Sequence, residues 1–75
     1  MNTKISINPN ICHGKPTITG TRVLVSNILS SLAVGESFED IQLEYPNISS
    51  EDIVAALEFG SELSSFETFP YEVAV

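Results

Sequence analysis

The side chains that could take part in chemistry are few. The single cysteine, Cys12, stands beside the single histidine, His13, and neighbouring side chains on an extended segment point to opposite faces, which makes a poor catalytic dyad. A zinc site needs about four ligands at regular spacing, and the sequence offers no such set. Glycine-rich cofactor motifs are also missing. We therefore expect no catalytic residue, no metal and no cofactor, and a binding function rather than an enzymatic one.

Charge divides the chain into two parts. Residues 1–35 contain all three lysines and arginines and no acid, whereas residues 36–75 contain all ten acids and no lysine or arginine, for a net charge of −7. An acidic surface repels phosphate backbones and attracts basic ones. The plainer alternative is a solvated surface that keeps the protein in solution.

A basic, hydroxyl-rich segment near the amino terminus is the first candidate site. Its cations and hydroxyls are the groups that contact phosphates in nucleic acids. The alternative, which we favour, is structural: the glycines and proline shape turns, and Arg22 fixes a hairpin to an acidic helix. The possible DNA-binding residues are Lys15, Thr17, Thr19, Thr21 and Arg22.

The carboxyl-terminal segment 65–75 is the second candidate site. Five large apolar residues follow a domain that already has a core, and burying each is worth about 1.5–3 kcal/mol. Their alternation from Phe69 onward suits addition of a strand to a partner's sheet edge, with two glutamates meeting a basic surface. Alternatively, the segment folds back over its own helices or stays disordered. The predicted partner-binding residues are Phe66, Glu67, Phe69, Tyr71, Glu72, Val73 and Val75.

The elements that must position these residues are a hairpin and three helices. Alternation around Ile5 and Ile7 and turn residues up to Gly20 predict extended structure over residues 4–25. Helices are expected to begin near Ser26, Ser37 and Ser49, the last two with an aspartate at the capping-box position. Expected helix ends are Gly35, Tyr45 before Pro46, and Ser64 or Ser65.

The third helix is expected to bury a stripe of Ile53, Ala56, Leu57 and Gly60. It also carries four acids, at positions 51, 52, 58 and 62, whereas a helix that reads the DNA major groove supplies Arg, Lys, Asn or Gln. Insertion of this helix into DNA is therefore disfavoured, although the fold would offer it as a recognition helix.

Together these patterns predict a mainly α fold: a three-helix, helix-turn-helix-like bundle with a small N-terminal β-hairpin and an extended C-terminal tail. Residues 1–64 would form the domain and residues 65–75 the partner-binding tail. One cysteine, no bilayer-length apolar run and no signal-peptide pattern favour a cytoplasmic location.

Residues 7–22, INPNICHGKPTITGTR, carry a specific motif, and VGESFEDI at 34–41, YP at 45–46 and SEDIVAAL at 50–57 continue the pattern. The sequence resembles the DUF433 family, whose motif is NP-x-I-x-x-GKP-x-I-x-GTR followed by three helices. Thr19 stands where the family often has a basic residue, and His13 where it often has glycine.

The resemblance implies a helix-turn-helix or homeodomain-like fold and, for many members, an antitoxin that neutralises a PIN-like ribonuclease toxin. We therefore expect a type II antitoxin that binds its toxin through the tail, as a homodimer or as a hetero-oligomer with the toxin. The alternative is a DNA-binding autoregulator that contacts operator DNA through the hairpin.

Overall fold

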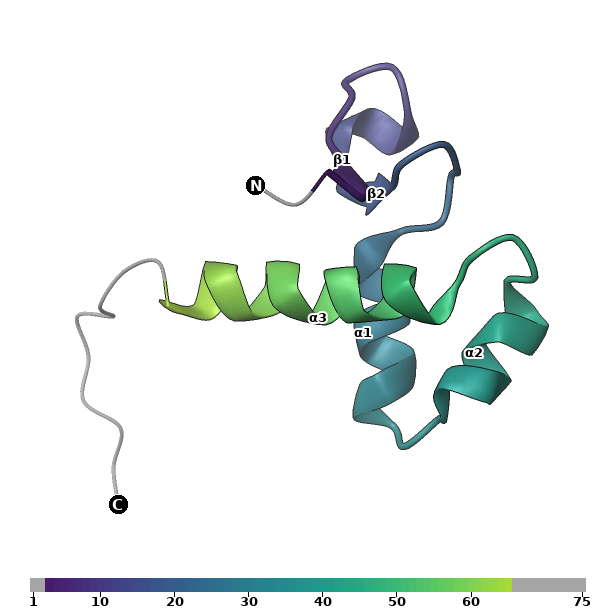
Figure 1. The fold of residues 1–75 in the computed structure, drawn as a ribbon. Helices are drawn as coiled ribbons and strands as arrows, with labels where there is room; N and C mark the ends of the chain where they lie inside the picture. The colour runs from purple at the N-terminus through teal and green to yellow at the C-terminus, as the bar shows by residue number, and fades with distance from the viewer. Residues whose placement is uncertain (1–2, 66–75) are drawn as a thin grey trace.

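The computed structural model describes residues 3–65. Its first feature is a short antiparallel hairpin, with β1 at Ile5–Ser6 and β2 at Thr17–Ile18 (Figure 1). Ile5 pairs with Ile18, and both side chains are buried. Because two strands alone are marginally stable, the hairpin depends on the helices that its apolar face contacts.

The loop between the strands turns through a left-handed segment. The one-turn 3-10 helix η1, Cys12–Gly14, has positive φ at Cys12 (51°), His13 (58°) and Gly14 (80°). The expectation of an extended Cys12-His13 pair was therefore wrong. Cys12 is also only half-buried rather than a core residue, and its Sγ donates to the Arg22 carbonyl oxygen at 3.7 Å.

Helix α1, Val25–Ala33, begins one residue before the expected Ser26 cap, and its N-cap Leu24 makes no side-chain capping bond. A tertiary contact takes the place of the cap, because the Val25 amide donates to the Pro16 carbonyl at 3.0 Å. At the other end, Gly35 adopts the expected left-handed conformation with φ of 93°. The Gly35 and Glu36 amides donate back to carbonyls of α1, which satisfies the end of the helix.

Helix α2, Phe38–Glu44, starts from a complete capping box. The Asp40 amide donates to Ser37 Oγ at 3.1 Å, and the Ser37 amide donates to Asp40 Oδ2 at 3.0 Å. The shorter Asp side chain thus replaces the usual Glu, as predicted. The helix ends before Pro46, as the sequence indicated.

Helix α3, Ser50–Ser65, is the longest element and also starts from a capping box. The Ser49 amide donates to Asp52 Oδ2 at 2.9 Å, and the Asp52 amide donates to Ser49 Oγ at 3.2 Å. In Figure 1, α3 lies across α1, and its last turns project beyond the other elements. In agreement, residues 61–65 are all exposed.

The core lies where the hairpin and the three helices meet. Four isoleucines are almost completely buried, and β2, α1, α2 and α3 each contribute one: Ile18, Ile28, Ile41 and Ile53. On α3 the predicted stripe is partly wrong, because Leu57 is 42% exposed, whereas Ala55 and Phe59 are buried. The buried face of α3 is rotated toward Ala55 because α3 packs against β1 as well as against α1 and α2.

The structure confirms the predicted fold class, which is mainly helical with three helices and a small N-terminal hairpin. The tail residues 66–75 lie outside the described residues. Within the described part, no helix is long and apolar enough to cross a membrane.

Candidate functional site

The hydroxyls of the three threonines proposed for phosphate contacts form hydrogen bonds with backbone carbonyls of the same chain. Thr17 is buried, and its Oγ1 lies 3.5 Å from the Ser6 carbonyl oxygen. Thr19 Oγ1 donates to the Thr3 carbonyl oxygen at 3.0 Å, and Thr21 Oγ1 donates to the Ile18 carbonyl oxygen at 2.8 Å. Each hydroxyl has a single proton to donate, so these residues stabilise the hairpin rather than offer donors to a phosphate.

The two cations of this segment, Lys15 and Arg22, are exposed on the turns of the hairpin. Arg22 borders a shallow hollow that Ser6, Ile11, Thr17, Gly20 and Thr21 also line. Within residues 3–65, however, Arg22 does not hold the hairpin to an acidic helix, as the structural interpretation expected. Lys4 makes that connection instead: its Nζ lies 3.7 Å from Asp52 Oδ1 at the start of α3.

The described residues do not bring catalytic or metal-binding groups together. No group of three or more His, Cys, Asp and Glu side chains in residues 3–65 could hold a metal ion. Cys12 and His13 lie on the left-handed turn, and no hydrogen bond joins their side chains in the described part.

The charged surface of the helices is acidic. Between residues 36 and 65 there are eight carboxylates and no lysine or arginine. Six of the eight are exposed, and the other two, Glu36 and Asp52, are partly buried. The six exposed carboxylates lie on α2 and α3: Glu39, Asp40, Glu44, Glu51, Glu58 and Glu62.

On α3 these acids border an exposed face, which we call the outer face of α3: the apolar Val54 and Leu57 and the small, polar Ser61. Positions separated by three and seven residues lie on one side of a helix. With residues 3–65 in place, Val54 is still 44% exposed and Leu57 is 42% exposed. Glu51, Glu58 and Glu62, at spacings of seven and four, follow one edge of this face and form its acidic edge.

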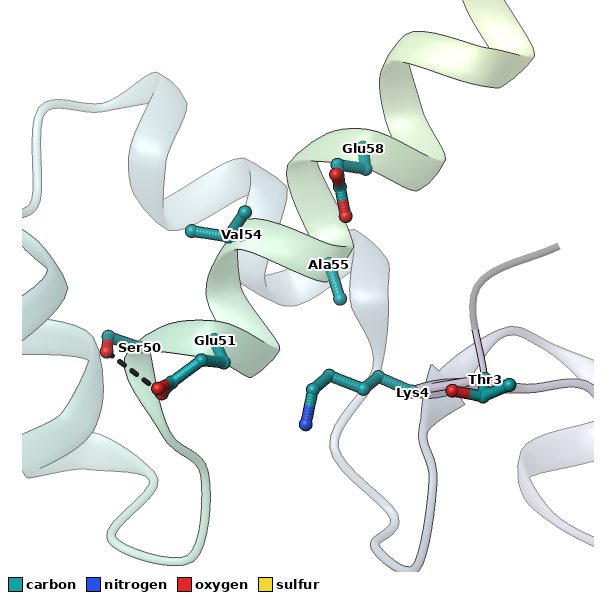
Figure 2. A pocket seen from close by; sticks show the side chains of 7 residues that line it. All are labelled: Thr3, Lys4, Ser50, Glu51, Val54, Ala55 and Glu58. Atoms are coloured by element: carbon teal, nitrogen blue, oxygen red, sulfur yellow. Dashed lines mark hydrogen bonds between the residues drawn. The ribbon is translucent and has the colours of Figure 1, made fainter.

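An open hollow of about 400 Å³ lies beside this acidic edge, between the start of β1 and α3. Figure 2 shows the side chains that line it. The Lys4 side chain reaches from β1 toward α3 across the hollow. Glu51 accepts a hydrogen bond from Ser50 Oγ at 3.2 Å. A hydrogen bond from its own backbone amide, then that serine, and more weakly the charge of Lys4, hold the pKa of Glu51 below its ordinary value. The Glu51 carboxylate is therefore ionised at neutral pH.

Sequence reasoning missed the outer face of α3, because it assigned Leu57 to the core. The available signal was that Val54 and Leu57 are spaced on one side of a helix beside three glutamates. The predicted partner-binding residues of the tail lie outside the described residues: Phe66, Glu67, Phe69, Tyr71, Glu72, Val73 and Val75.

Comparison with known proteins identifies one family. The model of the family described as a protein of unknown function, DUF433, matches residues 5–60, which run from β1 through most of α3. No curated protein and no solved structure matches the chain. Since the match covers the hairpin and all three helices over most of the chain, the protein belongs to the DUF433 family.

Proposed function

We propose that this protein is an antitoxin that binds a PIN-like ribonuclease and keeps it inactive. The observation that carries the proposal is the acidic surface of α2 and α3, with six exposed carboxylates and no lysine or arginine after Arg22. A nuclease receives RNA on a basic surface, and an acidic protein is electrostatically complementary to such a surface.

The mechanism we propose is occlusion without catalysis. The helical domain supplies a rigid acidic scaffold, and the tail residues 66–75 supply five large apolar side chains and two glutamates. These apolar residues would supply the buried area of the complex, since large aromatic side chains dominate binding energy at interfaces. The carboxylates would occupy positions that RNA phosphates take in the nuclease.

The hairpin is poorly suited to the alternative function, which is DNA binding. Its three threonine hydroxyls donate to backbone carbonyls, and its segment has only two exposed cations, Lys15 and Arg22. Affinity for DNA rises with the number of phosphate contacts, so one chain with so few cations is a weak DNA ligand. We therefore place protein binding before operator binding.

The test is co-expression of the full chain with the product of the adjacent gene, followed by co-purification and an RNA-cleavage assay. We expect the two proteins to co-purify and the antitoxin to suppress cleavage. A triple variant, Phe66→Ser, Phe69→Ser and Tyr71→Ser, should lose both effects. Within residues 3–65 the core residues lie between positions 5 and 59, and far-ultraviolet circular dichroism verifies that the variant keeps its helices. Equal inhibition by this variant would refute the role of the tail, and failure of the wild-type chain to bind would refute the antitoxin proposal.

A further inference from the structure

The outer face of α3 exposes two apolar side chains in the described part of the chain. Val54 and Leu57 are each more than two-fifths exposed, although both follow the deeply buried Ile53 along the helix. From Val54 to Ser61 the face runs along two turns, about 10 Å of helix, and its apolar side chains, Val54 and Leu57, occupy the first turn. Ser50 and Ser61 are small and exposed, so a second helix could approach this face closely.

The charges beside this face determine which kind of helix it fits. Glu51, Glu58 and Glu62 follow one edge, and among residues 3–65 the charged groups around the hollow are the carboxylates of Glu51, Asp52 and Glu58 and the ammonium of Lys4. Lys4 Nζ lies 3.7 Å from Asp52 Oδ1. The edge therefore presents negative charge to any molecule that covers Val54.

A second copy of this chain does not complement the face. Helix α3 contains no lysine or arginine, so pairing two copies through α3 would bring glutamates together without a cation on either helix. Like charges that face one another destabilise an interface. The complementary occupant has an apolar stripe flanked by lysines or arginines.

We propose that the outer face of α3 binds a basic amphipathic helix of a partner protein, with Val54 and Leu57 against its apolar stripe. A lysine or arginine of that helix would enter the hollow, where Val54 and Ala55 contact its methylene groups and Glu51 and Glu58 bind its charged end (Figure 2). This inference rests on the proposed function and deepens it, because the nuclease would contact the antitoxin at the outer face of α3 as well as at the tail.

The inference can be tested independently of the nuclease. The ¹⁵N-labelled full-length protein is titrated with a synthetic amphipathic helix of leucine and lysine, and in parallel with a matched peptide of leucine and glutamate. We expect the basic peptide to shift the amide signals of residues 50–62 and the acidic peptide to leave them unchanged. Shifts confined to α2 or the hairpin, or equal shifts with both peptides, would overturn the inference.

Two pairs of variants make the test specific. Glu51→Gln with Glu58→Gln should weaken peptide binding about tenfold, the effect of losing two partly exposed charged contacts. The matched control on α2, Glu39→Gln with Glu44→Gln, changes the net charge equally and should alter binding less than about twofold. Equal weakening by both pairs would mean that overall charge attracts the peptide, which contradicts a site on α3.

The apolar contribution has its own control. Val54→Ser with Leu57→Ser should abolish the shifts, whereas Leu43→Ser, at the 82% exposed Leu43 of α2, should preserve them. Far-ultraviolet circular dichroism verifies that each variant keeps its helices. If the co-expressed nuclease binds Val54→Ser/Leu57→Ser as tightly as wild type, the inference fails and the antitoxin proposal stands. If the nuclease does not bind the wild-type chain, the antitoxin proposal fails and the peptide titration still decides the inference.

Discussion

Asp52 connects two parts of the fold, and replacing it with alanine should destabilise the protein measurably. Its carboxylate accepts from the Ser49 amide at 2.9 Å through Oδ2, and its Oδ1 lies 3.7 Å from Lys4 Nζ. Loss of a capping side chain costs about 1 kcal/mol. The ion pair, with side-chain exposures of 48% for Lys4 and 16% for Asp52, contributes about 0.5 kcal/mol. We therefore expect Asp52→Ala to lower the free energy of unfolding by about 1.5 kcal/mol.

For a domain of this size that loss lowers the melting temperature by about 6–12 °C. The assay is thermal and urea unfolding followed by circular dichroism at 222 nm. A matched control exists in α2, where Asp40 forms the same capping box with Ser37 but has no ion pair among the described residues. Asp40→Ala should cost only the capping contribution, about 1 kcal/mol.

A double-mutant cycle isolates the ion pair. Lys4→Met and Asp52→Ala are measured singly and together, and the coupling between them should be about 0.5 kcal/mol and decrease with added salt. A coupling of zero, or one that salt leaves unchanged, would refute the conclusion that this pair holds β1 against α3. Equal destabilisation by Asp52→Ala and Asp40→Ala would refute it as well.

Three further predictions concern backbone conformation, ionisation and DNA. Gly35→Ala should cost about 1 kcal/mol in urea unfolding, because φ of 93° strains an L-residue although space is open around the added Cβ; an unchanged midpoint would contradict this. Burial, and to a smaller extent the hydrogen bond with Glu44, raises the pKa of Tyr45 above its ordinary value of 10.0. The folded state therefore holds this proton more tightly, so this contribution to stability is present below about pH 10 and is lost as pH rises through the raised pKa. Urea midpoints should show this alkaline loss in wild type and less of it in Tyr45→Phe, and identical profiles would exclude it. Finally, the isolated protein should not retard its own promoter DNA in a gel shift, and a salt-sensitive shift that Arg22→Gln abolishes would contradict this expectation.

The elements that local signals control could be predicted from the sequence. The capping boxes at Ser37 and Ser49 and the left-handed Gly35 depend on neighbouring residues, and the structure has all three as predicted. The start of α1 could not be predicted in this way. The Pro16 carbonyl, nine residues earlier in the sequence, accepts from the first amide of α1, so Ser26 is not needed as a cap.

The candidate site was harder to predict because it depends on how α3 is rotated about its axis. Leu57 fits a helical stripe with Ile53 at a spacing of four, whereas Phe59 fits one with Ala55 and Ala56 at spacings of four and three. The packing of α3 against β1 decides that Phe59 is buried. The roles of the hairpin threonines also depend on distant partners, because Thr19 Oγ1 donates to the Thr3 carbonyl oxygen across the hairpin. A sequence pattern shows that hydroxyls are present but not which acceptors they meet.

The most direct measurement of the central claim is the rate of RNA cleavage by the adjacent-gene nuclease as the full-length protein is added. If an acidic protein surface covers a basic RNA-binding surface, cleavage falls in proportion to the added protein. The inhibition then weakens as salt rises from about 0.05 M to about 0.5 M, because salt screens the attraction between the two surfaces. Cleavage at an unchanged rate with the protein in excess, at low salt, would contradict the account.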